Sequence, residues 1–139
     1  MFEKIYNIFK EEKVVAVIRT KTYEEAKEIS IAAIEGGMKV IEITMSVPSA
    51  PQLIKELKDK YNGICVGAGT VLTKDAVDEC IENNADFIVS PCVDEEIIKY
   101  SNQRKVLIIP GLMTISEVNE VYKMGLKFIK VFPGTVVGK

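Results

Sequence analysis

The chain has 139 residues, of which 47% are hydrophobic and 27% charged, with a formal net charge of −2 and no histidine. This length fits about one globular domain, and the interspersed charges provide no basic stripe for binding nucleic acid. No apolar run reaches the ~20 residues that cross a bilayer, and the acidic N-terminal segment is unlike a signal peptide, so we predict a cytoplasmic protein without a membrane partner.

Short apolar runs alternate with longer amphipathic stretches along the chain. Runs that are rich in β-branched residues and lack polar alternation are typical of parallel strands covered on both faces. An amphipathic segment at residues 2–10 precedes the first run, and we expect it to flank or plug that strand. The expected strands are residues 14–19, 40–45, 65–71, 86–91, 106–111 and 127–134.

Helices are predicted between these runs. A Thr-x-x-Glu spacing lets a hydroxyl and a carboxylate cap the first turn of a helix reciprocally, and glycine favours a helix end. In the helix after the first strand, Ala26, Ile29 and Ala33 fall on one face, which we expect to pack on the sheet. The predicted caps are Thr22 with Glu25 and Thr114 with Glu117, and the predicted stops are Gly36 with Gly37 and Gly125.

Two charged residues within the runs help to decide between an open doubly wound sheet and an eightfold barrel. When the second and sixth runs are aligned, Glu42 and Lys130 occupy equivalent positions. In a barrel such positions on alternate strands point to the axis in one layer, so these side chains would face each other. In an open sheet each charge would need its own partner, at a desolvation cost of several kcal/mol. We therefore predict an α/β fold of the (β/α)8 TIM-barrel type, with about six βα units in one domain over residues 1–139 that is truncated at its C-terminal end.

The same pair of residues suggests a reaction. Burial disfavours the charged form of a lysine, and a neutral amine such as that of Lys130 can attack a ketone to form a Schiff base. The carboxylate of Glu42 could then move protons during imine formation and carbon–carbon bond cleavage. The sequence has no histidine, so proton transfer must use other side chains such as this one. The alternative is a buried salt bridge that serves only the fold.

Other polar residues end the predicted strands, where a barrel has its active site. Arg19 suits a carboxylate or phosphate, with a surface salt bridge as the alternative. Thr44, Thr70 and Ser90 could donate hydrogen bonds to a substrate, or cap turns instead. The glycines of residues 67–70 do not continue as a dinucleotide-binding fingerprint, and we interpret them as room for the close approach of a substrate. We interpret three residues as buried or semi-buried free thiols without an assigned chemistry: Cys65, Cys80 and Cys92.

Six motifs in order resemble the 2-keto-3-deoxy-6-phosphogluconate (KDPG) and 4-hydroxy-2-oxoglutarate (KHG) aldolases: VIRT, IEITMSVPSA, VGAGTVL, FIVSPCVDEEI, IIPGLMT and KFIKVFPG. The likeness runs from about Val14 to the last residue. It implies a class I aldolase of carbohydrate metabolism that binds a small keto acid. Such an enzyme splits KDPG into pyruvate and glyceraldehyde 3-phosphate, or KHG into pyruvate and glyoxylate. The resemblance also implies a homotrimer that needs no metal or other cofactor.

The resemblance assigns roles to individual residues of this sequence. It implies that Lys130 forms the Schiff base with pyruvate and that Glu42 is the general acid and base. The substrate-binding candidates are Arg19 and Thr70, which would contact the pyruvate part, Pro91 and Phe132, which would line the pocket, and Thr44, which rests on its place at a strand end.

The sequence departs from the family pattern in two ways. Ser46 stands where some members carry an arginine, so we expect a contact to a substrate anion to be missing or to come from elsewhere. Two further βα units, with the loops that hold the substrate phosphate in that family, are also missing from the sequence. Two other functions therefore stay open. One is a catalytically inert, truncated fragment that forms an assembly, and the other is a phosphate-binding barrel isomerase or epimerase.

Overall fold

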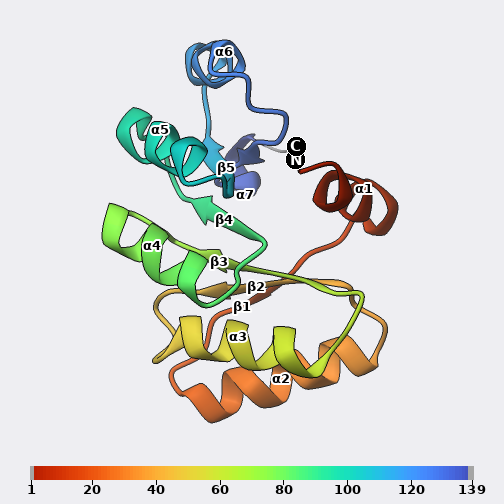
Figure 1. The fold of residues 1–139 in the computed structure, drawn as a ribbon. Coiled ribbons are helices and arrows are strands. Elements are labelled where there is room, and N and C mark those ends of the chain that lie inside the picture. The colour runs from red at the N-terminus through yellow and green to blue at the C-terminus, as the bar shows by residue number, and fades with distance from the viewer. Residues whose placement is uncertain (1, 138–139) are drawn as a thin grey trace.

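Six parallel strands form one curled sheet in the computed structural model, which describes residues 2–137. The strands neighbour one another in chain order: β1 (Ala16–Ile18), β2 (Val40–Thr44), β3 (Cys65–Gly69), β4 (Phe87–Ser90), β5 (Leu107–Leu112) and β6 (Lys130–Val131). The helices are α1 (Glu3–Glu12), α2 (Tyr23–Glu35), α3 (Ala50–Lys60), α4 (Lys74–Glu82), α5 (Glu95–Gln103), α6 (Ile115–Lys123) and α7 (Gly134–Val137). Figure 1 shows α2 to α6 in an arc around the outer face of this half-barrel, with α1 on the opposite side. The predicted α/β barrel architecture of six βα units is confirmed.

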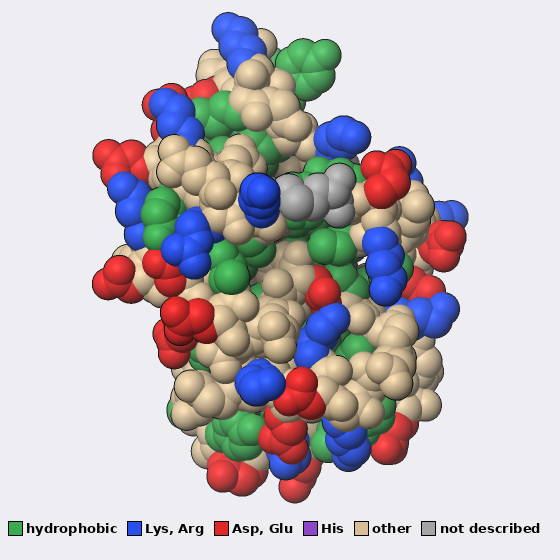
Figure 2. Space-filling view, in the orientation of Figure 1, with side chains coloured by type: hydrophobic (Ala, Val, Ile, Leu, Met, Phe, Trp, Pro, Cys, Tyr) green, Lys and Arg blue, Asp and Glu red, His purple; other side chains and the backbone are tan. Residues whose placement is uncertain are grey.

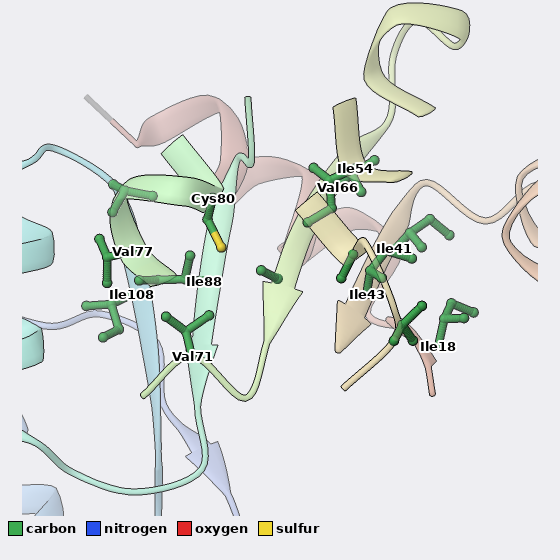
Figure 3. Packing of buried hydrophobic residues seen from close by; sticks show 14 of the residues in the cluster. Ile18, Ile41, Ile43, Ile54, Val66, Val71, Val77, Cys80, Ile88 and Ile108 are labelled. Atoms are coloured by element: carbon green, nitrogen blue, oxygen red, sulfur yellow. The ribbon is translucent and has the colours of Figure 1, made fainter. Parts of the chain in front are cut away.

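The main hydrophobic core lies between the outer face of the sheet and the helices. Because side chains alternate across a strand, every second residue points towards the helices, as Ile41, Ile43 and Ile88 do. Full burial of one such side chain stabilises the fold by about 1.5–3 kcal/mol, which is why the strand runs are so apolar. Figure 3 shows these three residues with Ile18, Ile54, Val66, Val71, Val77, Cys80 and Ile108.

A smaller apolar cluster fills the inner face of the sheet near the amino ends of the strands. It contains the first residues of β2 to β5, which are Val40, Cys65, Phe87 and Leu107. Tyr6 and Phe9 of α1 pack against this cluster, so α1 covers the amino end of the half-barrel. The segment at residues 2–10, which we expected to flank or plug the first strand, thus packs against residues of β2 to β5.

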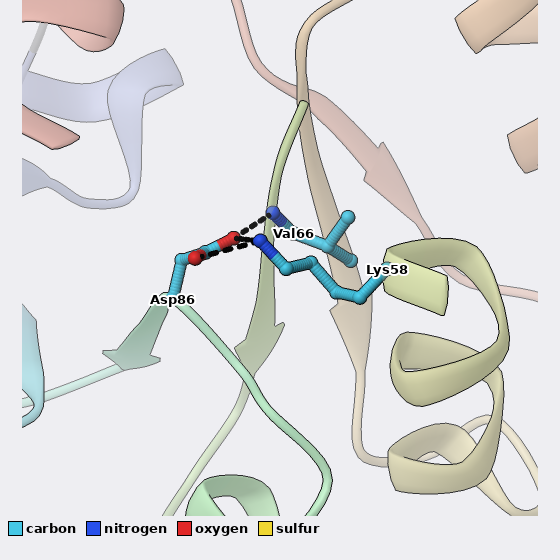
Figure 4. A network of polar contacts seen from close by, with 3 residues as sticks. All are labelled: Lys58, Val66 and Asp86. Carbon is cyan, nitrogen blue, oxygen red and sulfur yellow. Dashed lines mark hydrogen bonds and ion pairs between the residues drawn. The ribbon is translucent and has the colours of Figure 1, made fainter. Parts of the chain in front are cut away.

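A polar network joins α3 to the amino ends of β3 and β4 (Figure 4). The carboxylate of Asp86 accepts hydrogen bonds of 2.9 and 2.8 Å from Lys58 Nζ and one of 2.8 Å from the backbone N–H of Val66. Asp86 also donates its own N–H to the carbonyl of Val66 at 2.8 Å. The side chains of Lys58 and Asp86 are only 24% and 23% exposed. Because both charges have lost most of their contact with water, the ion pair between them replaces the lost hydration.

The capping residues agree with the sequence prediction at one helix and in part at another. At α6, Thr114 Oγ1 accepts the N–H of Glu117, and Glu117 Oε2 accepts the N–H of Thr114, which completes the capping box. This helix ends before Gly125, which has a φ of +79°. At α2 the hydroxyl of Thr22 accepts the N–H of Glu25 at 3.2 Å. The second bond of the box, from the N–H of Thr22 to the carboxylate of Glu25, is absent from the contacts of residues 2–137. Only half of the predicted capping box is therefore present.

The predicted sheet-facing side of α2 is wrong at one residue. Ile29 is 44% exposed, whereas Ala26 and Ser30 are fully buried. From Ala26 the next buried residue on this face is therefore four positions further on, at Ser30, and not three. The hydroxyl of Ser30 donates to the carbonyl of Ala26 at 2.6 Å, so this buried polar group has a hydrogen-bond partner. The helix ends as predicted, at the C-cap Gly36 and at Gly37 with a φ of +100°.

The sixth strand is shorter and less buried than the sequence predicts. Only Lys130 and Val131 pair with β5, opposite residues 111–112. Within the described part of the chain, β6 has a strand on one side only, so Ile129, Val131 and Phe132 are 38%, 46% and 44% exposed. The prediction of a fully buried sixth run is therefore wrong. These residues are exposed because β6 lies at the edge of the described sheet.

Charged side chains of both signs are interspersed on the face of the molecule in Figure 2. Some of them form ion pairs between neighbouring helical segments, such as Lys27 with Glu56 at 2.5 Å and Arg104 with Asp78 at 2.9 Å. Exposed pairs of this kind contribute at most about 1 kcal/mol each. Between residues 2 and 137, no helix has the length and apolar character needed to cross a bilayer.

Candidate active site

A cavity of about 290 Å³ lies on the inner face of the half-barrel. Its lining has two ionisable side chains, those of Glu42 from β2 and Lys130 from β6. The rest of the lining is apolar and includes Phe9, Val17, Phe87, Val89, Ile109 and Phe128. An apolar cavity with a few convergent polar groups is typical of a site for a small molecule.

Glu42 reaches this cavity because β2 alternates its side chains. Ile41 and Ile43 point outwards to the helices, so Glu42 points inwards, where it is only 5% exposed. Burial raises the pKa of the Glu42 carboxyl, and the positive charges of Lys130 and Arg19 oppose that rise. A carboxyl whose pKa is raised by burial is better suited to giving a proton as well as taking one.

The glycines of β3 leave space for side chains of the protein itself. A Cβ atom at Gly67 would lie 2.6 Å from ring carbons of Phe87, and one at Gly69 would overlap Oε1 of Glu42. The interpretation of these glycines as room for a substrate is therefore wrong. They are required because Phe87 and Glu42 lie across the backbone of β3.

Lys130 is half-buried, and its Nζ lies 5.0 Å from the centroid of the Phe132 ring. Its backbone pairs with Gly111 of β5. None of the ion pairs among residues 2–137 joins Lys130 to Glu42. The two groups thus line one cavity, and the direct salt bridge that we considered as the alternative is absent from the described ion pairs.

Arg19 and Thr70 meet at the carboxyl ends of the strands. The guanidinium of Arg19, which follows β1, donates to Thr70 Oγ1 at 3.3 Å, and Thr70 follows β3. Thr70 has a φ of +61°, a left-handed conformation that is uncommon for a β-branched residue and is often found at functional sites. Arg19 makes no ion pair with the described carboxylates, so the surface salt bridge that we considered for it is absent.

The other hydroxyls at strand ends bond within the protein. Thr44, the last residue of β2, is fully buried, and its Oγ1 lies 2.9 Å from Oγ of Ser46. Ser90 donates to the carbonyl of Cys92 at 2.9 Å, so it stabilises the turn after β4. Of the two alternatives considered for Ser90, the turn is the one present.

The cysteines divide into two buried residues and one exposed residue. Burial is the main cause that raises the pKa of Cys65 and that of Cys80 to about 12, so both thiols stay protonated and unreactive. Cys92 is exposed, which corrects the prediction that it is buried or semi-buried. Across residues 2–137, no group of three or more His, Cys, Asp or Glu residues could hold a metal ion.

A family model described as KDPG and KHG aldolase matches residues 5–139 of the sequence. The chain belongs to this aldolase family. The KHG/KDPG aldolase of Escherichia coli (strain K12) is 34% identical over 125 residues, which are 90% of this chain and 59% of that protein. The chain thus spans about three fifths of the length of the curated relatives it matches.

Solved structures of the family have the same fold. The KDPG aldolase of Zymomonas mobilis ZM4, solved with 3-phosphoglycerate, is 30% identical with a TM-score of 0.88 over 99% of this chain and 66% of that chain. The KDPG aldolase of Legionella pneumophila, with pyruvate captured at low pH as a covalent carbinolamine intermediate, is 30% identical with a TM-score of 0.84. The match covers 94% of this chain and 64% of that one.

The seven predicted site residues lie in three groups. Glu42 and Lys130 share the cavity, and the ring of Phe132 lies beside Lys130. The second group is Arg19 with Thr70, joined by a hydrogen bond, and the third is formed by residues that lie apart from the cavity lining. Thr44 bonds to Ser46, and the carbonyl of Pro91 lies against Gly111, the β5 partner of Lys130.

Two aromatic residues that line the cavity were not assigned to the site from the sequence. Phe9 of α1 lines the cavity, whereas residues 2–10 were expected to flank or plug the first strand and were given no part in the site. Phe128 lines it too, two residues before Lys130. For Phe9 the signal was the amphipathic pattern of residues 2–10, which gives the apolar face of a helix but not the surface that it meets. For Phe128 the signal was its spacing of two residues from Lys130, which puts both on one face of a strand.

Proposed function

We propose that this protein is a class I aldolase that forms a Schiff base between Lys130 and the ketone of a 2-keto acid. The observation that carries this proposal is the pairing of Glu42 and Lys130 in one apolar cavity, as the only ionisable lining residues in the described chain. Membership of the KDPG and KHG aldolase family supports it, as does the carbinolamine with pyruvate in the Legionella pneumophila relative. The proposed substrates are KDPG, cleaved to pyruvate and glyceraldehyde 3-phosphate, and KHG, cleaved to pyruvate and glyoxylate.

The proposed reaction begins at Nζ of Lys130. The neutral amine attacks the ketone carbon, and the ketone oxygen takes up a proton to give a carbinolamine. Loss of water gives an iminium ion. Cleavage of the bond between C3 and C4 sends its electron pair towards the iminium, which becomes an enamine, while the C4 hydroxyl loses its proton and leaves as an aldehyde. Protonation of the enamine at C3, followed by addition of water, releases pyruvate and the free lysine.

Glu42 is the proposed proton carrier for these steps. It would give a proton to the leaving water of the carbinolamine and take the proton from the C4 hydroxyl. The raised pKa of its buried carboxyl suits this double role, because a group that is always ionised could not donate. The apolar walls of the cavity limit competing reactions of the iminium with bulk water.

Arg19 and Thr70 are the proposed contacts for the carboxylate of the keto acid. The planar guanidinium can bind a carboxylate with two parallel hydrogen bonds, and its link to Thr70 limits the directions in which it can point. Ser46 carries no charge, so Arg19 is the proposed cation for this anion. Phe132 is proposed to complete the wall of the site beside Lys130, and Pro91 and Thr44, which lie outside the lining of the cavity, are proposed to extend the site at the strand ends.

Borohydride trapping tests this function. The protein is incubated with pyruvate and sodium borohydride, and its intact mass is then measured. We expect one reduced pyruvate per chain in the wild type and none in Lys130→Met. The exposed Lys123 at the end of α6 gives a matched control, because Lys123→Met should trap as much pyruvate as the wild type.

The same experiment separates the alternatives. A wild-type chain that folds but forms no adduct would overturn the proposal and favour an inert barrel fragment. Catalytic activity that is retained in Lys130→Met would favour chemistry without an imine, as in an isomerase or epimerase. Both alternatives can therefore be distinguished from the aldolase by one mass measurement and one rate.

We also propose that the protein forms a homotrimer. In support, one matching structure, 29% identical with a TM-score of 0.79, is a cube-shaped cage designed by fusing symmetric oligomeric domains. Light scattering on the purified protein should give three times the mass of the chain. A cytoplasmic location stays a prediction, which fractionation of the source cells would test.

A further inference from the structure

The segment that carries Lys130 has little support of its own. β6 has two residues, its neighbours Ile129 and Phe132 are 38% and 44% exposed, and within residues 2–137 it pairs with β5 alone. Its backbone bonds to β5 extend only to the pairing of residues 130–131 and to the N–H of Phe132, which donates to the carbonyl of Leu112 at 3.0 Å. Such an edge segment is free to shift unless side chains hold it.

Phe128 is the side chain that ties this segment to the interior. Its ring stacks on the ring of Tyr6, with centroids 5.0 Å apart and planes inclined by 21°. It also contacts Phe9, with centroids 5.6 Å apart. Phe9 in turn meets the fully buried Phe87 edge-on, with centroids 5.0 Å apart. A chain of aromatic contacts therefore connects the core of β4, through α1, to the residue two positions before Lys130.

The same rings lie next to the reacting group. Phe9, Phe87 and Phe128 all line the cavity that contains Glu42 and Lys130. Lys130 is therefore held from two sides, by β5 on its backbone and by α1 through Phe128. The contact with α1 is independent of the hydrogen bonds of the sheet, since α1 lies on the inner side of the half-barrel.

We propose that α1 is a positioning element of the active site, in which Tyr6 and Phe9 clamp Phe128 and thereby fix Lys130 opposite Glu42. This inference rests on the proposed function, because it concerns how well Lys130 meets the keto acid. Displacement of a reacting group by about 1 Å can cost on the order of 100-fold in rate. Loss of the clamp should therefore slow imine formation without preventing it.

The test measures the rate of borohydride trapping by pyruvate in single turnover. In Tyr6→Leu and Phe9→Leu, a branched aliphatic side chain replaces the ring, and each should lower the limiting rate at saturating pyruvate by about 10- to 100-fold. Tyr6→Phe, which keeps the ring, should restore the wild-type rate. Phe2→Leu is the matched control, because Phe2 meets Tyr6 edge-on at 6.3 Å and lies one contact further from Phe128. It should trap at the wild-type rate.

The rate separates positioning from simple loss of folding. Partial unfolding lowers the final amount of adduct, whereas a shifted Lys130 lowers the rate constant of the folded molecules, so the two effects are read from one time course. If Tyr6→Leu and Phe9→Leu trap within twofold of the wild-type rate constant, the clamp is overturned while the aldolase function stands. If the wild type itself forms no adduct, the proposed function fails first.

If both leucine variants fail to fold, two milder substitutions of Phe128 test the clamp instead. Phe128→Tyr keeps the ring, and Phe128→Met keeps an apolar side chain of similar length without one. A rate constant for Phe128→Met that is at least 10-fold below that of Phe128→Tyr supports the clamp, and equal rate constants contradict it.

Discussion

The guanidinium of Arg19 donates a hydrogen bond of 3.3 Å to the hydroxyl of Thr70 and so links the ends of β1 and β3 across β2. β2 carries Glu42, and the charge of Arg19 is one of the two that oppose the rise in the pKa of that carboxyl. The link therefore fixes a cation beside the proposed acid and base. It also lies at the carboxyl ends of the strands, where an α/β barrel binds its substrate.

Replacement of Arg19 by lysine should weaken binding of the keto acid. A lysine keeps the charge but loses the two-pronged contact and the donor geometry of the guanidinium. Since a hydrogen bond to a charged group contributes about 1.5–3 kcal/mol, we expect the half-saturating pyruvate concentration in trapping to rise by about 10-fold or more. Arg104→Lys, on the outer surface beside Asp78, is the control and should leave that concentration unchanged. Unchanged binding in Arg19→Lys would contradict the proposed contact.

Glu42→Gln should change how stability depends on pH. Burial raises the pKa of Glu42 in the folded protein above its unfolded value, so the folded state binds more protons in the interval between the two pKa values. Stability of the wild type should therefore be greater below the unfolded pKa and fall as pH rises through the folded pKa. Urea unfolding at several pH values should show this contribution in the wild type and not in Glu42→Gln. A contribution of opposite sign would mean that the charges of Lys130 and Arg19 outweigh burial.

Asp86→Ala should destabilise the protein through the network in Figure 4. The change leaves Lys58 without its partner and removes the acceptor for the N–H of Val66. Because these groups are partly buried, we expect a loss of about 1–3 kcal/mol in the free energy of unfolding. Asp59→Ala removes the partner of the exposed pair with Lys55 and should cost about 0.5 kcal/mol or less. Equal losses for the two variants, measured by urea unfolding, would show that burial of the network is irrelevant.

Gly69→Ala should impair the proposed reaction by moving Glu42. The added Cβ would overlap Oε1 of Glu42, so the carboxylate must shift. We expect the rate of imine formation to fall by about 10-fold or more, since it depends on the position of the proton carrier. Gly134→Ala is the control, because its Cβ would meet no atom within 4 Å. A Gly69→Ala protein with the wild-type rate would mean that Glu42 takes no part in the step that limits trapping.

The motifs and alternating runs of the sequence were sufficient to predict the order of the elements and the inward direction of Glu42. Side chains alternate between the two faces of a strand. Since Ile41 and Ile43 face the helices, Glu42 between them must face the interior. The same reasoning was only partly right for Lys130. The length and burial of β6 depend on the strands beside it, and that information does not lie in the run itself.

The contacts between distant elements were decided by tertiary structure alone. The hydrogen bond from Arg19 to Thr70 joins residues 51 positions apart, and the stack of Phe128 on Tyr6 joins the segment before β6 to α1. Local sequence determines periodicity, caps and turn residues, because these depend on neighbours within a few positions. It cannot determine which surfaces meet when the sheet curls, because that depends on the packing of all side chains at once. The sequence by itself thus determined the βα order and the chemical groups of the candidate site, and the curvature of the sheet decided how α1, Phe128 and Lys130 come together.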